Sequence, residues 1–298
     1  MLDFTVAIPT YNGAARLPLV LAALAAQRGT ESLTWEIWVI DNNSRDTTAQ
    51  VVQDYQAQWP CSYPLHYGHE ARQGLAYARQ RAIELAAGCY VAFLDDDNLP
   101  APDWVQAAYH FGEQHRPAGA FSGRICGRYE VEPPANFSRI AQFLAIRDHG
   151  PEARRFRPEH LQLPPGAGLV VRRSAWLAAV PRDLAIAGNQ GKLLARGEDY
   201  EALLHLHRAG WEIWYNPAMS LDHLIPPWRL ERSYLLNLAR TCGLATYELR
   251  LVTVPPGQGL WLYGRTLLGN LKRLALHLLK YRGRVRTDLI AAFELTFH

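Results

Sequence analysis

Short apolar runs alternate with helix-forming stretches over the first 130 residues, and this alternation constrains the fold more than any other feature of the chain. Short runs rich in apolar and β-branched residues are typical of buried strands, and apolar residues recur at helical spacing between them. Strands that alternate with helices in this way predict a parallel sheet with helices on both faces. The strands are expected at residues 4–8, 35–40, 63–67, 90–94 and 120–126.

The second half of the chain is less regular. Proline pairs at 133–134 and 164–165 bound a segment rich in arginine and histidine, which we expect to mix loops and short helices. The elements expected beyond it are a strand at 169–172, helices at 175–180 and 198–209, a strand at 211–215 ended by a turn at Asn216-Pro217, and helices from Ser233 onward, interrupted around 255–257.

The region from Leu249 to Thr287 is basic, with eight Lys and Arg residues and no acid, although the net charge of the chain is only +3. Leucines recur between these cations, which is typical of a basic amphipathic helix on an anionic membrane surface. A packing helix with a solvated basic face and a dimer contact are the alternatives, and the oligomeric state stays open. Nucleic-acid binding is not expected, because aromatic residues are sparse and no recognition motif occurs.

The four cysteines lie far apart without a CxxC pair, and the N-terminus has neither the basic nor the apolar segment of a secretory leader. We therefore expect reduced thiols and a cytoplasmic protein. No stretch reaches the roughly 18–20 apolar residues of a membrane span. If the basic region binds lipid, the protein is expected to be peripheral on the inner face of the cytoplasmic membrane.

Polar side chains follow three of the expected strands, where parallel sheets bind their ligands. Three consecutive carboxylates, Asp95 to Asp97, repel one another by about 1 kcal/mol per pair at 4 Å in water and about 4 kcal/mol at an effective dielectric constant of 20, so they require a cation or a helix N-terminus. Carboxylate oxygens suit Mg²⁺ or Mn²⁺, which also bridges phosphate oxygens. A solvated acidic turn before the next helix is the alternative. The three polar strings are Pro9-Thr10-Tyr11-Asn12, Asp41-Asn42-Asn43-Ser44 and Asp95-Asp96-Asp97-Asn98.

Other polar residues have both a functional and a purely structural interpretation. Glu198-Asp199 opens a helix, where the helix dipole favours carboxylates, but a carboxylate there could also be a general base. Asp41 could bind a base or a ribose, or form an Asx turn. His223 could be a metal ligand, although most single histidines are not. The arginines that could meet phosphate include Arg72, Arg79 and Arg229.

Residues 3–235 resemble family 2 glycosyltransferases, because five strings occur together in the order and at about the spacing of that family. The strings are VAIPTYNG, VIDNNSRDTT, GLAYARQRAIELAAGCYVAFLDDDNLP, PPGAGLVVRRSAW and GEDYEALLHLHRAGWEIWYNP. The strings FLDDDNLPAPDWV, LPPGAGLVVRRSAW and AGWEIWYNP are similar to the glycosyltransferases of hormogonium polysaccharide biosynthesis. The QxxRW signature of processive synthases is absent, so transfer of a single sugar is expected.

The resemblance implies an α/β protein of the GT-A fold, with a mostly parallel, Rossmann-like nucleotide-binding sheet flanked by helices. The implied domain covers residues 1–232, with a nucleotide-binding half at about 1–130 and an acceptor half at about 131–232, and a basic helical extension follows at 233–298. The implied activity is metal-dependent, inverting transfer of a hexose from a nucleotide sugar, most simply a UDP-sugar, to a hydroxyl of a glycan or lipid-linked acceptor in polysaccharide or exopolysaccharide biosynthesis. A non-catalytic nucleotide-sugar-binding or scaffold protein of the same fold is the alternative.

By the same resemblance, Asp199 is the catalytic base beside Glu198, and Asp95 and Asp97 are the outer members of a DxD motif. The implied ligands of Mn²⁺ or Mg²⁺ are Asp97, Asp95 and His223. The implied nucleotide-binding residues are Pro9, Thr10, Tyr11, Asp41, Arg72, Gly74, Arg79, Asp95 and Asp96. The implied sugar and acceptor pocket contains Gly166, Ala167, Gly168, Glu198, Trp228 and Arg229. Arg72 departs from the family pattern, which usually has an asparagine there.

Overall fold

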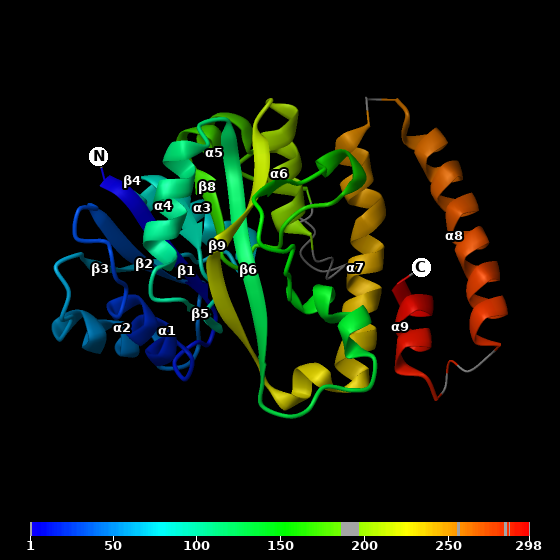
Figure 1. Ribbon diagram of the computed structural model, residues 1–298, viewed down its shortest axis with the longest axis horizontal. Coiled ribbons are helices and arrows are strands. Elements are labelled where there is room, and N and C mark those ends of the chain that lie inside the picture. The colour runs from blue at the N-terminus through cyan, green and yellow to red at the C-terminus, as the bar shows by residue number, and fades with distance from the viewer. Residues whose placement is uncertain (1, 186–196, 255–256, 283–284, 286, 298) are drawn as a thin grey trace.

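The computed structural model describes residues 2–185, 197–254, 257–282, 285 and 287–297, and within them one mixed sheet runs through the body of the protein (Figure 1). Its strands are β1 (Leu2–Thr10), β2 (Trp35–Asp41), β3 (Leu65–His69), β4 (Gly88–Phe93), β5 (Asn98–Pro100), β6 (Ala118–Tyr129), β7 (Arg154–Arg155), β8 (Leu169–Arg172) and β9 (Glu212–Ile225). The α-helices are α1 (Leu17–Ala25), α2 (Thr48–Ala57), α3 (Leu75–Leu85), α4 (Trp104–Gln114), α5 (Arg173–Ala179), α6 (Glu198–Arg208), α7 (Arg232–Thr253), α8 (Gly259–Tyr281) and α9 (Leu289–Phe297). Short 3₁₀ helices are η1 (Phe137–Arg139), η2 (Ala141–Leu144), η3 (Pro158–His160) and η4 (Pro227–Leu230).

The first four strands confirm the predicted parallel sheet. They lie in the order β3-β2-β1-β4, and each neighbouring pair is parallel. The side chains of β1 alternate between two cores, because successive residues of a strand point to opposite faces. Phe4, Val6 and Ile8 pack with α1, α2 and α4 on one face, whereas Ala7 packs with α3, α5 and α6 on the other. The helices therefore cover both faces, as the sequence predicted.

The second half of the sheet is mixed. β8 lies antiparallel between β4 and β6, β6 pairs with β9 in parallel, and β5 and β7 each pair with β9 antiparallel. The expectation of a mostly parallel sheet therefore holds for the part built by β1 to β4. The short strand β5 follows the acidic triplet directly and places Asn98 opposite His223. No sequence pattern predicted this pairing, because a strand of three residues is too short to show a periodicity.

The predicted turn at Asn216-Pro217 was wrong, since β9 continues through it to Ile225. The register between β6 and β9 shifts at this point, from Ser122 opposite Tyr215 to Arg124 opposite Ser220, so an irregularity in the pairing absorbs the proline. Proline has no N–H to donate to a ladder, and such irregularities are where strands tolerate it. The buried Asn216 side chain donates to the Ala107 carbonyl and accepts from the Ala218 N–H.

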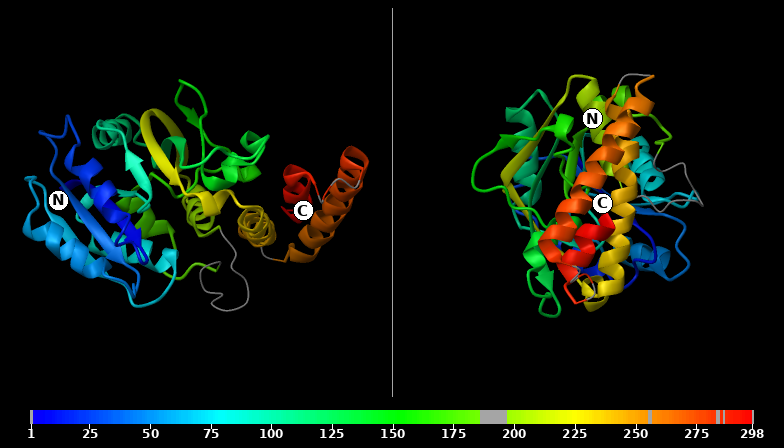
Figure 2. Two further views of the ribbon diagram at one scale, coloured as in Figure 1. Left: turned by 90° about the horizontal axis from the view of Figure 1, so that it is seen from below. Right: turned by 90° about the vertical axis from the view of Figure 1, so that its right-hand side faces the viewer.

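The C-terminal helices extend the molecule on the side away from β3 (Figures 1 and 2). α7 packs against α6 and α9, and α8 lies outermost, in contact with α7 and α9. The expected break between helices lies at residues 254–258, of which Pro255 and Pro256 fall outside the described residues, as do the basic residues Arg284 and Arg286. The prediction of a helical C-terminal region is confirmed.

We expect Gly123→Ala to destabilise the protein by about 2–3 kcal/mol, because a Cβ at the irregularity in β6 would overlap the Met219 carbonyl, and backbone cannot move aside as a side chain does. Chemical denaturation measures the difference. Gly264→Ala in α8 is the control, since no atom lies within 4 Å of its Cβ. It should be neutral or stabilise by up to about 1 kcal/mol, because Ala is the better helix former. Equal stability of the two variants would contradict the close approach of β6 and β9.

Candidate active site

Each carboxylate of the acidic triplet has a different arginine partner. The Asp95 carboxylate lies 3.6 Å from Arg79, Asp96 lies 2.8 Å from Arg16, and Asp97 lies 2.9 Å from Arg229. The repulsion expected among three adjacent carboxylates is thus offset by three cations from three separate segments. The sequence indicated that a cation was required, but it did not identify Arg16, which lies in no motif.

Hydrogen bonds to Asp96 connect the end of β1 to the segment that follows β4. Its two oxygens accept hydrogen bonds from Arg16 Nε and Nη2, both at 2.8 Å, and Oδ2 also accepts from the Thr10 hydroxyl at 2.5 Å. Two parallel N–H donors on one carboxylate give a geometry that is strong and directional. Asp96 and Thr10 were both predicted to bind nucleotide, and in this structure they bind each other.

Asp97, His223 and Arg229 form a compact, mostly buried group. His223 Nδ1 lies 2.9 Å from the Leu144 carbonyl, so Nδ1 carries the proton and Nε2 is left with a lone pair. Nε2 lies 2.8 Å from Arg229 Nη1 and 3.4 Å from Asp97 Oδ2. Burial alone would raise the pKa of the Asp97 carboxyl, but the positive charge of the adjacent Arg229 opposes this and holds that pKa below the usual value.

These atoms fit part of a divalent cation site. Neighbouring ligands around an octahedral Mg²⁺ lie about 3 Å apart, close to the separation of Asp97 Oδ2 and His223 Nε2. The carbonyl that fixes the His223 ring is the kind of outer contact that orients metal-binding histidines. Among the described residues, however, no three His, Cys, Asp or Glu side chains gather as a ready-made metal centre. Asp95 is paired with Arg79, and Arg229 contacts both of the remaining donor atoms.

The side chain of Arg79 links Asp199, in the first turn of α6, to Asp95 at the end of β4. The Arg79 side chain, from α3, is buried and forms an ion pair with Asp199 as well as with Asp95. Asp199 Oδ2 also accepts a hydrogen bond of 2.9 Å from the Gly166 N–H. A Cβ at Gly166 would overlap both Arg79 and Asp199, so only glycine permits this approach. The structure therefore brings together two carboxylates that are about 100 residues apart.

Burial controls the charges around Arg79. It raises the pKa of the Asp95 carboxyl and lowers the pKa of the Arg79 guanidinium, and the attraction between the two opposes both shifts. A narrow pocket beside them is lined by Arg79, Leu169, Trp176, Glu198 and Asp199, among others. Glu198 therefore shares the pocket with Asp199, as predicted for the pair.

Asp41 forms the Asx turn that was the alternative to a nucleoside contact. Its Oδ1 accepts from the Ser44 N–H at 2.9 Å, and its Oδ2 accepts from the Tyr67 hydroxyl at 2.8 Å. Burial and this bond raise the pKa of Tyr67 to about 12. Pro9, near the end of β1, is buried, and Tyr11, directly after β1, is 42% exposed. The aromatic ring of Tyr11 is thus the accessible feature of that strand end.

The loop before α3 is held by Asn42, which the sequence analysis named only as a member of a polar string. The Asn42 side chain donates to the carbonyls of Glu70 and Arg72 and accepts from the Gly74 N–H at 2.7 Å. The Arg72 guanidinium stacks on Tyr77 and pairs with Glu70 and Asp183. Gly74 is the N-cap of α3, and Arg72 lies at the surface beside it.

The six predicted acceptor residues divide between two parts of the site. Gly166 and Glu198 lie near Asp199, and the buried Ala167 precedes Gly168 at the start of β8. Arg229 contacts Asp97. The neighbouring Trp228 ring is half exposed and packs edge-on against Tyr234.

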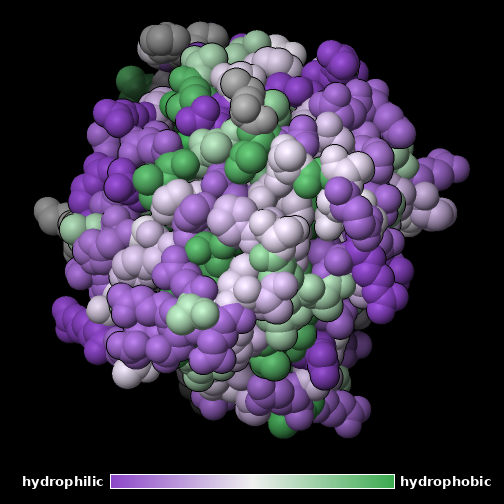
Figure 3. Space-filling model, turned by 90° about the vertical axis from the view of Figure 1, so that its left-hand side faces the viewer, coloured by the Kyte–Doolittle hydropathy of each residue, from purple (hydrophilic) through white to green (hydrophobic). Residues whose placement is uncertain are grey.

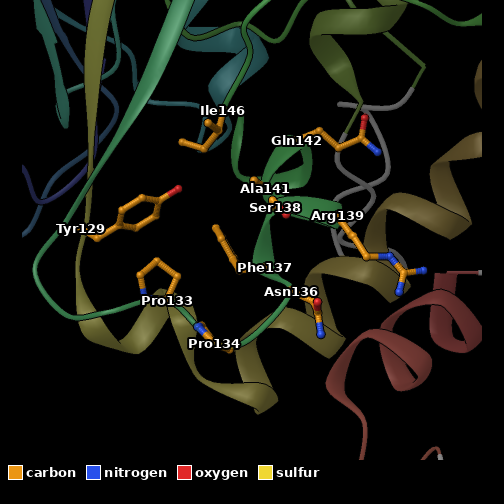
Figure 4. A pocket seen from close by; sticks show the side chains of 10 residues that line it. All are labelled: Tyr129, Pro133, Pro134, Asn136, Phe137, Ser138, Arg139, Ala141, Gln142 and Ile146. Atoms are coloured by element: carbon orange, nitrogen blue, oxygen red, sulfur yellow. The ribbon is translucent and has the colours of Figure 1, made fainter.

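A cavity of about 710 Å³ that the sequence did not predict lies between the end of β6 and the turns η1 and η2 (Figure 4). Tyr129 and Pro133 line one side and Phe137 and Ala141 the other. Tyr129 is paired with Ile225, two residues beyond His223 on β9. The cavity is therefore close to the Asp97–His223 pair, and none of the six predicted acceptor residues lines it.

Comparison with known sequences identifies the family. The profile described as "Glycosyl transferase family 2" matches residues 5–176. A validoxylamine A glucosyltransferase of Streptomyces hygroscopicus is 34% identical over 130 residues, covering 44% of this chain and 30% of the relative. A chondroitin synthase of Escherichia coli is 31% identical over 105 residues, covering 35% of this chain and 14% of the relative. This chain therefore matches less than a third of the length of these two relatives.

Comparison with solved structures confirms the predicted GT-A fold. A mannosyltransferase of Pyrobaculum calidifontis, in complex with GDP-Man and Mn²⁺, has a TM-score of 0.62 at 18% identity and covers 100% of this chain and 88% of its own. S. aureus TarS, in complex with UDP-GlcNAc, has a TM-score of 0.54 at 17% identity, with coverage of 82% and 66%. At these identities the likeness concerns the fold alone.

We expect Arg79→Met to destabilise the protein by about 3 kcal/mol or more, because it leaves partly buried carboxylates without their counterion. Arg81→Met on the same helix is the control, since its contact with Glu84 is 3.7 Å long and lies near the surface, where ion pairs contribute about 0–1 kcal/mol. Urea denaturation of both variants measures the difference. Losses within 1 kcal/mol of each other would show that Arg79 is not the counterion of this site.

Proposed function

The chain belongs to glycosyl transferase family 2, and we propose that it transfers a hexose from a nucleotide sugar, most simply a UDP-sugar, to an acceptor hydroxyl with inversion at the anomeric carbon. The observation that carries this proposal is the Arg79 bridge, which lies between Asp199 and the acidic end of β4. Asp199, the base in this proposal, thus lies beside the strand end where α/β sheets bind their ligands.

The donor would lie across the ends of β1, β2 and β4. The nucleoside would contact the exposed ring of Tyr11, and the diphosphate would lie near Asp95 and Asp97. Asp97 and His223, with Asp95, would hold Mn²⁺ or Mg²⁺, which when bound offsets the negative charge of the departing diphosphate. The relatives support a nucleotide-sugar donor, since the solved structures similar in fold bind GDP-Man or UDP-GlcNAc.

Asp199 would act as the base. As the acceptor oxygen bonds to the anomeric carbon, its proton passes to Asp199, and the bond from that carbon to the diphosphate oxygen breaks with its electron pair leaving on the diphosphate. Arg79 forms an ion pair with Asp199 and would hold its carboxylate beside the strand end where the acceptor hydroxyl reacts. Attack from the face opposite the leaving group inverts the configuration, and no covalent intermediate on the protein is needed.

The acceptor is proposed to be a glycan or lipid-linked glycan in polysaccharide biosynthesis. The similarity to a chondroitin synthase supports a glycan acceptor. We propose the division into a nucleotide-binding half at about 1–130, an acceptor half at about 131–232 and a helical extension at 233–298, which the start of α7 at Arg232 supports. The closer similarity to hormogonium polysaccharide enzymes stays a prediction.

We propose that α8 rests on an anionic membrane surface. Ten large apolar side chains of this helix are 38–88% exposed, among them Leu260, Leu268 and Leu279. Basic residues such as Arg265 and Lys272 lie between them. Among the described helices, none is long and apolar enough to cross a membrane. The opposite end of the molecule has a mostly hydrophilic surface with small apolar groups (Figure 3), so the contrast singles out α8.

Asp199→Asn should reduce turnover by about 10²–10⁴-fold, the usual contribution of a general base. Binding of UDP with Mn²⁺, measured by calorimetry, should change little, because the base contacts the acceptor. Release of UDP or GDP is measured with a panel of nucleotide sugars, with and without divalent cation. The panel identifies the donor sugar, and the release rate gives the turnover. Turnover within threefold of the wild type would remove Asp199 from the mechanism, and no transfer with any donor would favour the non-catalytic alternative.

Reversing the charges of Arg265, Lys272 and Arg273 to Glu should abolish co-sedimentation with anionic vesicles, since each cation near such a surface contributes about 1 kcal/mol. These three are chosen because Lys280 holds α9 through Glu294. Wild-type binding should weaken in 1 M salt, where the Debye length falls to about 3 Å.

Reversing three exposed arginines of the body, Arg28, Arg116 and Arg157, makes the same change in net charge and is the matched control. It should leave sedimentation with the vesicles nearly intact. Equal sedimentation of the α8 variant and the wild type would instead identify α8 as a packing or dimer helix.

A further inference from the structure

The guanidinium of Arg229 contacts both side-chain atoms that would coordinate a cation at this end of the site. It lies in η4, directly after β9, and its two terminal nitrogens contact His223 Nε2 at 2.8 Å and Asp97 Oδ2 at 2.9 Å. Its side chain is mostly buried, and its Nε is buried without a hydrogen-bond partner in the structure. The guanidinium is therefore positioned by its contacts with these two atoms, and its Nε makes no hydrogen bond that adds to them.

We propose that Arg229 is the resident cation of the Asp97–His223 pair and that a divalent cation binds there only by displacing it. This inference rests on the proposed function, in which the same pair holds Mn²⁺ or Mg²⁺. The two occupants exclude each other, because the carboxylate oxygen and the imidazole lone pair that Arg229 contacts are the atoms that would coordinate the metal. Two adjacent positive charges in a mostly buried site would also repel.

Displacement has a cost that the donor can offset. A guanidinium moved from its carboxylate partner in a mostly buried site is unfavourable unless it finds another anion. The diphosphate of the donor is such an anion, and the planar set of N–H donors of an arginine matches phosphate oxygens. Cation and nucleoside diphosphate should therefore bind cooperatively, with Arg229 passing from Asp97 to the diphosphate as the cation enters.

Calorimetric titration of the full-length protein with MnCl₂, in the absence and presence of UDP, tests this exchange. The wild type should bind Mn²⁺ at least tenfold more tightly with UDP present than without it. Arg229→Gln should bind Mn²⁺ without UDP at least tenfold more tightly than the wild type does, because the competing cation is gone. Addition of UDP should raise the Mn²⁺ affinity of this variant by a smaller factor than it raises that of the wild type.

Arg128→Gln is the matched control. Arg128 is an exposed residue of β6, paired with Leu224 beside His223, so its removal takes away one nearby positive charge without touching Asp97. A charge at the surface is screened, and this variant should change Mn²⁺ affinity by less than about threefold. Arg229→Lys keeps the charge without the planar fork and should fall between the wild type and Arg229→Gln. Arg229→Lys also tests the exchange if Arg229→Gln fails to fold.

Equal Mn²⁺ affinity of the wild type, Arg229→Gln and Arg229→Lys without UDP would overturn the exchange, and so would a loss of Mn²⁺ binding in Arg229→Gln when that variant is folded by circular dichroism. If no variant binds Mn²⁺ either with or without UDP, the metal step of the proposed function fails together with the exchange. If Mn²⁺ binds but the Arg229 variants match the wild type, only the exchange fails.

Discussion

The Arg79 guanidinium is the interaction on which the site depends, because it joins three elements that the chain supplies far apart. It reaches from α3 to Asp95 at the end of β4 and to Asp199 at the start of α6, and it packs over the Phe93 ring. A buried cation is stable only where carboxylates surround it. Its burial therefore fixes where α6 must begin relative to the parallel sheet, and the Gly166 N–H completes the arrangement by binding Asp199.

The same principle extends across the whole strand edge. Asp95, Asp96 and Asp97 are each neutralised by an arginine, and each arginine comes from a different segment. These ion pairs differ in whether they leave the carboxylate able to bind a ligand. Asp96 is saturated by Arg16 and Thr10 and connects two strand ends, so it is a structural residue of the site. Asp97 holds one guanidinium contact, from Arg229, which we propose that a ligand replaces, whereas Asp95 keeps the contact with Arg79 that joins α3 to α6.

The sequence predicted the parallel half of the sheet well because each strand there is a local apolar run ended by polar residues. It predicted Asp199 only through resemblance, since a carboxylate in a first helical turn has an ordinary explanation in the helix dipole. Arg16, β5 and the partners of Asn42 were missed because the paired groups lie 28 to 125 residues apart, and no periodicity signals such a pairing. The strand β9 was cut short for the related reason that Asn-Pro is locally a turn signal, while the bulge that accommodates it depends on β6.

The order of the helices connects the chemistry to the proposed membrane surface. α6 carries Asp199 in its first turn, α7 packs on α6, and α8 lies against α7 with its leucines exposed. Two helix-to-helix contacts, α6 with α7 and α7 with α8, therefore connect Asp199 to the exposed leucines. Under the proposed function, a lipid-linked acceptor held at α8 would approach Asp199 from the side of α7, whereas β1 to β3 lie at the other end of the molecule (Figure 1).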